Sequence, residues 1–137
     1  MSLNTRIELK KDYVEVRIEG TFDSQSSISV NDAILGAIEK YQATKIFVDF
    51  RKVTGDLAPM ERFHYAENFA KKYLELIQAG RIKRPQIIFL GNYPQFDPGR
   101  FDETVAVNRG VPIRSTDDPK EVWEWLGIDP EGGTENK

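Results

Sequence analysis

The sequence predicts a single α/β domain with a mostly parallel sheet and an antiparallel strand at the N-terminal end. Residues 46–50 (IFVDF) and 87–90 (IIFL) are short apolar runs without alternation. Such runs are typical of strands that are covered on both faces inside a parallel sheet. Amphipathic helical patterns precede and follow each run, so strands and helices alternate along the chain. The predicted order is β-β-α-β-α-β-α-β-α.

The composition narrows the class of protein. The chain has 137 residues, which is enough for one hydrophobic core. Its net charge of −3 does not indicate a basic surface for binding nucleic acid. The absence of cysteine excludes disulfides and Cys-ligated metals. No stretch approaches the roughly 20 apolar residues of a membrane span, and no signal-peptide pattern is present. We therefore expect a soluble cytoplasmic protein.

Two segments near the N-terminus alternate apolar with charged residues, which predicts an antiparallel hairpin with one buried face. The apolar positions are Ile7 and Leu9 in the first segment and Val14, Val16 and Ile18 in the second. Gly20 ends the second strand, and the polar, Ser-rich residues 21–29 predict a loop. Ser29 and Asp32 resemble a capping box, so we expect the first helix to begin there.

The central strand is expected at residues 45–50. The next helix is predicted to begin near Pro59, because proline suits the first turn, and to end at Gly80. The second apolar run, 87–90, then forms the neighbouring buried strand.

An Asp-Pro pair opens each of the last two predicted helices, since Asp caps a helix and proline fits the first turn. The first of them covers residues 97–109, and a short strand at 111–114 follows. The last helix runs from Asp118 to Gly127. Residues 128–137 are rich in glycine and charge, which predicts a flexible tail.

Two short motifs and their order resemble the STAS-like superfamily, which includes bacterial anti-sigma-factor antagonists. They are Gly20-Thr21-Phe22-Asp23 after the second strand and Val48-Asp49-Phe50-Arg51-Lys52-Val53 at the end of the central strand. The Thr-Val-Ala-Val-Asn-Arg-Gly segment within 101–110 is similar to an uncharacterised STAS/SEC14-like branch. The resemblance covers residues 5–127. It implies a STAS-like domain in a bacterial, regulatory protein that acts through protein–protein contacts and can form a homodimer.

The sequence departs from this family in one respect. The antagonists carry a phosphorylatable serine in the loop after the central strand, where a phosphate changes the local charge by about −2. Here Leu57-Ala58-Pro59-Met60 takes that place, and Thr54 is the nearest hydroxyl. The expected function is therefore a non-enzymatic interaction domain without the usual serine.

The loops at the carboxyl ends of parallel strands gather on one edge of a sheet, where ligands bind in folds of this kind. The residues expected on this rim are Thr21, Asp23, Lys52, Thr54, Asp56, Asn92, Tyr93 and Thr116. We interpret the rim as a surface for a protein partner. The alternative is ordinary turn chemistry, which favours the same residue types.

No catalytic site, metal site or cofactor is expected. His64 is the single histidine and falls on the solvent side of its helix, without a visible group to tune its pKa. Asp49 lies in an apolar strand, where a structural hydrogen bond to a loop or helix end is the simpler explanation. The sequence contains no nucleophile elbow, P-loop or dinucleotide fingerprint.

The alternative function is a small-ligand or lipid carrier of the SEC14-like type. Its pocket would lie between the sheet and the rings of Phe63, Phe69 and Tyr73, unless these rings fill the core. Trp123 and Trp125 cannot share a helix face. We expect Trp125 to pack inward and Trp123 to be partly exposed, where it could anchor an interface.

Overall fold

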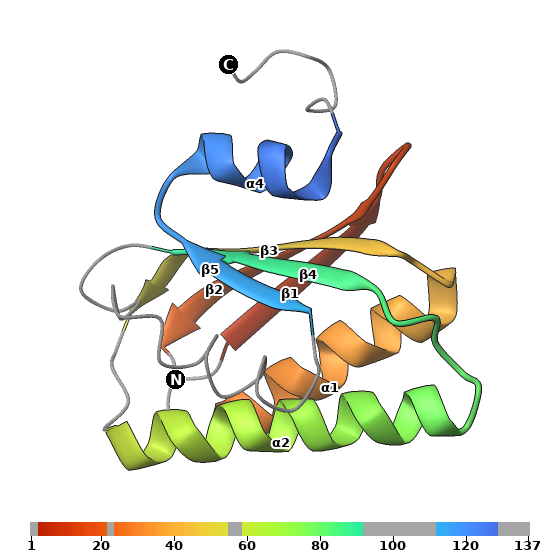
Figure 1. Ribbon diagram of the computed structural model, residues 1–137. Helices are drawn as coiled ribbons and strands as arrows, with labels where there is room; N and C mark the ends of the chain where they lie inside the picture. Colours follow the sequence, from red (N-terminus) through yellow and green to blue (C-terminus); the bar gives the residue numbers. More distant parts are fainter. Residues whose placement is uncertain (1–2, 22–23, 55–58, 92–111, 129–137) are drawn as a thin grey trace.

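The computed structural model describes residues 3–21, 24–54, 59–91 and 112–128. They form three layers, in which one five-stranded sheet lies between α1 and α2 on one face and α4 on the other (Figure 1). The elements are β1 (Leu3–Leu9), β2 (Val14–Thr21), α1 (Ser24–Tyr41), β3 (Lys45–Thr54), α2 (Pro59–Gln78), β4 (Gln86–Leu90), β5 (Ile113–Thr116) and α4 (Pro119–Leu126).

The sheet has the order β1-β2-β3-β4-β5; β1 and β2 are antiparallel, and every other neighbouring pair is parallel. The two apolar runs lie side by side, with Ile46 opposite Ile87 and Val48 opposite Phe89. The predicted α/β class and strand arrangement are therefore confirmed. The helix predicted at 97–109 lies outside the described residues, and β5 begins two residues later than expected.

Helix α1 begins at Ser24, five residues before the predicted start. The Ser-rich segment that predicted a loop instead forms the first turns of this helix. The capping box was wrong for the same reason, because Asp32 lies inside α1 and accepts a hydrogen bond from Lys72 of α2 at 2.7 Å. Serine favours helix starts as well as loops, so composition alone did not separate the two.

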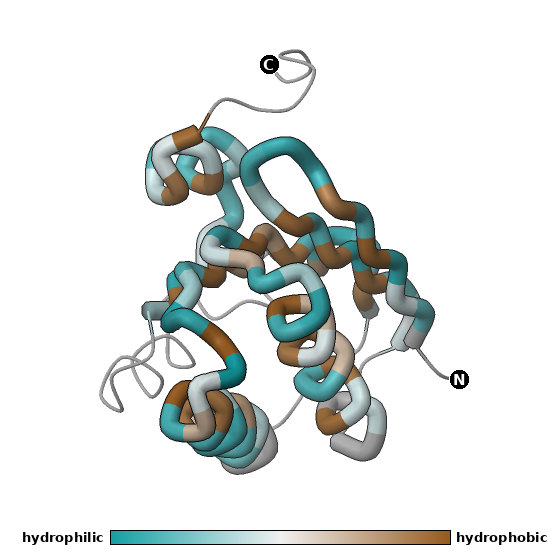
Figure 2. Tube along the Cα trace, turned by 90° about the vertical axis from the view of Figure 1, so that its right-hand side faces the viewer, coloured by the Kyte–Doolittle hydropathy of each residue, from teal (hydrophilic) through white to brown (hydrophobic). Residues whose placement is uncertain are grey.

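Apolar side chains fill both spaces between the layers. The larger core joins the sheet to α1 and α2, and the smaller core joins it to α4 through Tyr13, Phe47, Ile88, Leu90, Val122 and Leu126. Figure 2 shows apolar residues following the strands through the middle of the molecule.

Strand β1 forms one edge of the sheet, and its apolar residues are only partly covered. Ile7 and Leu9 face the same side as Val16 and Val14, their partners on β2. Ile7 is 37% exposed and Leu9 is 61% exposed. The expectation of a buried face holds for β2 and was wrong for β1, because the helices cover the centre of the sheet better than its edge.

The residues predicted to start and end the last helix are confirmed. Asp118 caps α4 by accepting a hydrogen bond from the Lys120 backbone N–H at 3.0 Å, and Pro119 occupies the first turn. Gly127 ends the helix with φ of 71°, a left-handed conformation that glycine adopts without a steric cost.

Candidate functional site

Two exposed hydroxyls meet at the carboxyl ends of β2 and β3. Thr21 and Thr54 are the last residues of these strands and lie opposite each other in register. Their Oγ1 atoms are 3.3 Å apart, and Thr54 Oγ1 also donates to the Gly20 carbonyl oxygen at 3.3 Å. Both side chains reach solvent. The structure thus brings two of the eight rim residues into direct contact.

Lys52 lies beside this pair on a strand rather than on a loop. Strand β3 continues four residues past its expected end, so Lys52 pairs with Glu19 of β2 and is exposed. The buried side chain of Val53 explains the extension, because it continues the strand after the apolar run has stopped. A strand holds Lys52 and Thr54 more rigidly than a loop would.

Thr116 has a structural role at the end of β5. It is buried; its hydroxyl accepts a hydrogen bond from the Asp118 N–H at 3.0 Å and donates to the Glu121 carboxylate. These contacts connect β5 to the start of α4, which is the turn chemistry considered as the alternative. The remaining rim residues, Asp23, Asp56, Asn92 and Tyr93, lie outside the described residues.

A second polar cluster lies on the α4 side of the sheet. Arg17 lies opposite Asp49, and Glu15 lies opposite Phe47, whose ring contacts Trp123 of α4. These side chains therefore share the face that α4 covers in part. The alternation of β2 predicted charged residues on this side, but their network could not be predicted, because their neighbours follow only from the strand register.

Asp49, like Glu15, is a buried carboxylate of this cluster. It is 7% exposed and accepts hydrogen bonds from the Arg51 backbone N–H at 3.0 Å, from Nε at 3.1 Å and from Nη2 at 2.9 Å. Burial acts to raise the pKa of Asp49, but the Arg51 hydrogen bonds outweigh it and hold the pKa below the ordinary value. The expected structural hydrogen bond is present, with a side chain two residues away instead of a loop or helix end.

The cluster continues across β2 to β1 through three cation–carboxylate contacts. Arg17 Nη2 lies 2.8 Å from Glu15 Oε2, and this hydrogen bond raises the pKa of Arg17. Lys10 Nζ lies 3.0 Å from Glu8 Oε1 and 3.8 Å from Glu15 Oε1. The hydrogen bond from Lys10 lowers the pKa of Glu8. The carboxylates of Glu8, Glu15 and Asp49 on this face are therefore ion-paired rather than poised for proton transfer.

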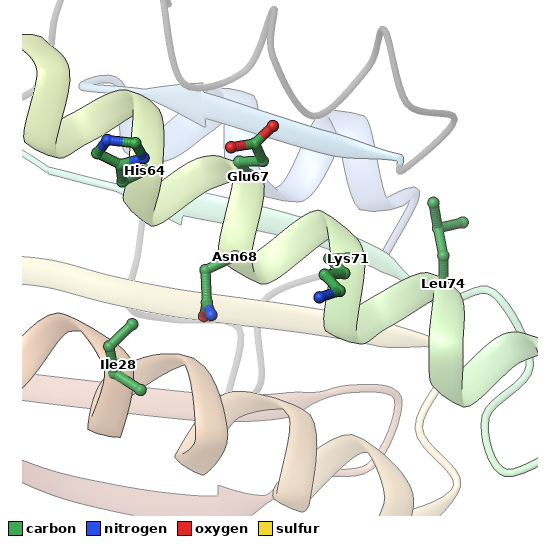
Figure 3. A pocket seen from close by; sticks show the side chains of 6 residues that line it. All are labelled: Ile28, His64, Glu67, Asn68, Lys71 and Leu74. Carbon is green, nitrogen blue, oxygen red and sulfur yellow. The ribbon is translucent and has the colours of Figure 1, made fainter.

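His64 lies on an open groove between α1 and α2. Figure 3 shows the side chains that line it, which are Ile28, His64, Glu67, Asn68, Lys71 and Leu74. Asn68 points toward α1, where its Oδ1 accepts a hydrogen bond from Asn31 Nδ2 at 2.9 Å. His64 is exposed, as expected from the sequence, so it lacks the shielded pocket that a general base requires.

The rings proposed to enclose a ligand belong to the core. Phe69 and Tyr73 are buried in the large cluster, and Phe69 packs edge-on against Phe89 with ring centroids 6.3 Å apart. The Tyr73 hydroxyl donates to the Pro85 carbonyl at 3.0 Å. These two side chains fill space between α2 and the sheet. The side chain of Phe63 lies outside the described residues.

The orientation of the two tryptophans agrees in part with the expectation. Trp123 makes edge-to-face contacts with Tyr13 and Phe47, with ring centroids 5.5 and 5.3 Å apart. Both Trp123 and Trp125 are half-buried and pack against the smaller core. Trp125 packs against the core and Trp123 is partly exposed, as expected, but Trp123 also packs inward, because α4 presents it to the end of the sheet where β2 and β3 begin.

The described residues contain no group of three or more His, Cys, Asp or Glu side chains that could hold a metal ion. In the same part of the chain, the helices are too short or too polar for a membrane crossing.

Comparison with protein-family models and with curated proteins finds no match. Among solved structures, an anti-sigma factor antagonist from Mycobacterium paratuberculosis is similar, with a TM-score of 0.55 and 14% sequence identity over 91% of this chain and 94% of that chain. The antagonist SpoIIAA in its unphosphorylated form has a TM-score of 0.48 and 14% identity, over 90% of this chain and 98% of that chain. An uncharacterised protein from Shewanella loihica with a SpoIIAA-like fold has a TM-score of 0.46 and 15% identity, over 91% and 94%.

At these identities the likeness shows the fold alone, and the first structure carries that conclusion. The chain has the STAS-like fold that its motifs indicated.

Proposed function

We propose that this chain is a non-enzymatic regulatory domain that binds a protein partner through the rim around Thr21, Lys52 and Thr54. The observation that carries the proposal is the pair of exposed hydroxyls, 3.3 Å apart, at the carboxyl ends of two neighbouring parallel strands. In open α/β sheets this edge is where partners and ligands bind. A cytoplasmic location, as expected from the sequence, belongs to the same proposal.

The chemistry of the rim favours recognition over catalysis. A threonine nucleophile requires an adjacent base to accept its proton. Among the described residues, the Thr21 and Thr54 hydroxyls contact each other and the Gly20 carbonyl, and neither group is such a base. Hydroxyls and a lysine held on strands supply hydrogen bonds and one positive charge, which suits a complementary polar surface on a partner.

The core packing favours this proposal over a small-ligand or lipid carrier. Phe69 and Tyr73 occupy the space in which a carrier of that type would hold its ligand. Close-packed interiors leave few voids larger than a water molecule.

The similar Mycobacterium paratuberculosis protein is an anti-sigma factor antagonist, which supports a regulatory partner for this chain. Because Leu57-Ala58-Pro59-Met60 contains no hydroxyl, we propose that binding here does not depend on the usual phosphoserine.

Site-specific photo-crosslinking tests the rim directly. A photoreactive residue replaces Lys52 in one variant and Lys83 in a matched control. Both positions are exposed, and Lys83 precedes the amino end of β4, away from the carboxyl ends of β2 and β3. In native lysate we expect one discrete adduct from position 52, competed by unmodified protein and weakened by Thr54→Val, and none from position 83. Equal labelling from both positions, or no effect of Thr54→Val, would count against this surface.

A further inference from the structure

Strand β1 has an open edge in the described sheet, because β2 is its only neighbour there. The Lys10 N–H donates to the Tyr13 carbonyl at 2.9 Å and closes the hairpin. Pairs in an antiparallel ladder alternate between hydrogen-bonded and non-hydrogen-bonded types. Residues 6 and 8 therefore direct their backbone groups toward β2, and Thr5, Ile7 and Leu9 direct theirs away from it. Each of these three offers one donor and one acceptor at the open edge.

The side chains along this edge are sorted by face. Ile7 and Leu9 are partly exposed on the α1 side, and Arg6 and Glu8 lie on the opposite side. Arg6 faces Arg17 and Glu8 faces Glu15 across the hairpin, so like charges lie opposite each other. Lys10 bridges the two glutamates, and Arg17 pairs with Glu15. Among the ion pairs of the described residues, none includes Arg6.

We propose that β1 pairs antiparallel with β1 of a second copy of this chain, about a two-fold axis at Ile7. The two sheets then become continuous. In this register Ile7 lies opposite the partner's Ile7 and Thr5 lies opposite the partner's Leu9. Arg6 lies opposite the partner's Glu8, and the symmetry repeats that pair. Arg6 gains an opposite charge directly across from it, where its own hairpin places Arg17, and the exposed Ile7 side chains cover each other.

Neighbouring two-fold registers are less favourable. An axis at Arg6 sets two arginines opposite each other, and an axis at Glu8 sets two glutamates opposite each other. An axis at Leu9 pairs Glu8 with the partner's Lys10 but carries the pairing into the hairpin turn, beyond the end of β1. The Ile7 register therefore combines charge complementarity with the full use of residues 5–9.

The occupant is a second copy because one segment supplies both charges and both apolar residues. An isologous two-fold interface requires such self-complementarity. An open edge of this kind would otherwise be a site of uncontrolled pairing. The proposed contact is separate from the rim, which lies at the carboxyl ends of β2 and β3, so either proposal can fail alone.

Sedimentation velocity of the full chain over a wide concentration range tests the proposal. We expect a reversible species of twice the chain mass. Arg6→Glu and Glu8→Arg each place like charges opposite each other twice and raise the dimer Kd by about tenfold or more. The double variant restores the pairs with reversed signs and returns the Kd to within about threefold of the original. Lys72→Glu breaks an exposed ion pair on α2 and is the matched control that leaves the Kd unchanged.

Thr5→Pro gives a second, backbone-based test. Proline removes an N–H that points away from β2, a position where edge strands tolerate it. We expect native circular dichroism and no dimer, and this variant decides the question if a charge variant fails to fold. A chain that stays monomeric at every concentration overturns the proposal. So does a dimer that survives both single charge variants or Thr5→Pro, or one that the double variant fails to restore.

Discussion

Arg51 binds both carboxylate oxygens of Asp49, the residue two positions before it on β3, with Nε–Oδ1 and Nη2–Oδ2 distances of 3.1 and 2.9 Å. Both residues belong to β3, at the point where its register with β2 shifts between Arg17 and Glu19. The half-exposed guanidinium can keep part of its hydration, whereas the carboxylate is almost fully buried. The ion pair therefore makes it possible to bury a charge inside the central strand.

Asp49→Asn is expected to lower the free energy of unfolding by about 1–2 kcal/mol at neutral pH, because it removes the charge that Arg51 binds. The folded pKa of Asp49 lies below the unperturbed value of 3.8. Its contribution is thus fully present above that value and is lost as pH falls through the lower, folded pKa. Urea unfolding across pH should show the wild-type and variant curves converging in acid.

Asp32→Asn is the matched control for Asp49→Asn. It also breaks an ion pair, but Asp32 is exposed on α1, so the change should stay within about 0.5 kcal/mol. An equal loss in the two variants would contradict the importance of burial at Asp49.

Asn31→Asp tests the polar contact between α1 and α2. Asn31 is 0% exposed, and its Nδ2 donates to Asn68 Oδ1 at 2.9 Å and to the Tyr65 carbonyl at 3.3 Å. An aspartate there would place a buried carboxylate against two hydrogen-bond acceptors. We therefore expect the free energy of unfolding to fall by about 3 kcal/mol at neutral pH. Acid should relieve part of the loss, because a protonated carboxyl can donate.

Thermal unfolding of Asn31→Asp and Asn68→Asp shows which of the two side chains donates the hydrogen bond between them. Asn68→Asp keeps an acceptor for Asn31, so its cost should stay below about 1 kcal/mol. If both variants are equally unstable, the assigned direction of this hydrogen bond is wrong.

Trp123→Ala is expected to lower the free energy of unfolding by about 2–3 kcal/mol, because it removes a half-buried ring and its contacts with Tyr13 and Phe47. Trp125→Ala should cost less, because its ring makes no comparable aromatic pair among the described residues. Guanidinium unfolding of the two variants gives the comparison, and a larger loss at Trp125 would contradict the observed rotation of α4.

The Tyr73 phenol should ionise above the ordinary pKa of tyrosine. Burial raises the pKa of Tyr73 above the ordinary 10.0, so the neutral phenol stabilises the fold below that pH and the contribution is lost at higher pH. An absorbance titration of phenolate should show a late component that is lost in Tyr73→Phe. Tyr73→Phe should also cost about 1 kcal/mol, because the Pro85 carbonyl loses its donor.

The sequence was sufficient for features that depend on local chemistry. The runs at 46–50 and 87–90 gave the two central strands, and the Asp118-Pro119 pair and Gly127 gave the bounds of α4. Features that depend on neighbours across the fold were missed. From the sequence, Asn31 is expected at the surface, but α2 covers it in the fold. Leu9 is exposed because β1 lies at the edge of the sheet.

In the candidate site, too, features set by local sequence could be predicted and features set by neighbours across the fold could not. The carboxyl-end rule placed Thr21 and Thr54 on one edge before their contact was known. It could not show that the Thr116 hydroxyl is used by the start of α4, nor that Arg17 faces Asp49, because both depend on register and on local hydrogen bonding. The direction of Trp123 depends on how α4 rotates against the sheet, which its own pattern leaves open.

The smaller core has a consequence for the order of events during synthesis. Tyr13 and strands β3 and β4 contribute apolar side chains to it, and α4, which covers them, follows about thirty residues after β4 in the chain. A nascent chain on the ribosome can therefore close the α1–α2 side first, while Ile88 and Leu90 still face water. Until residue 126 has emerged, this half-finished sheet is the surface that a chaperone would recognise.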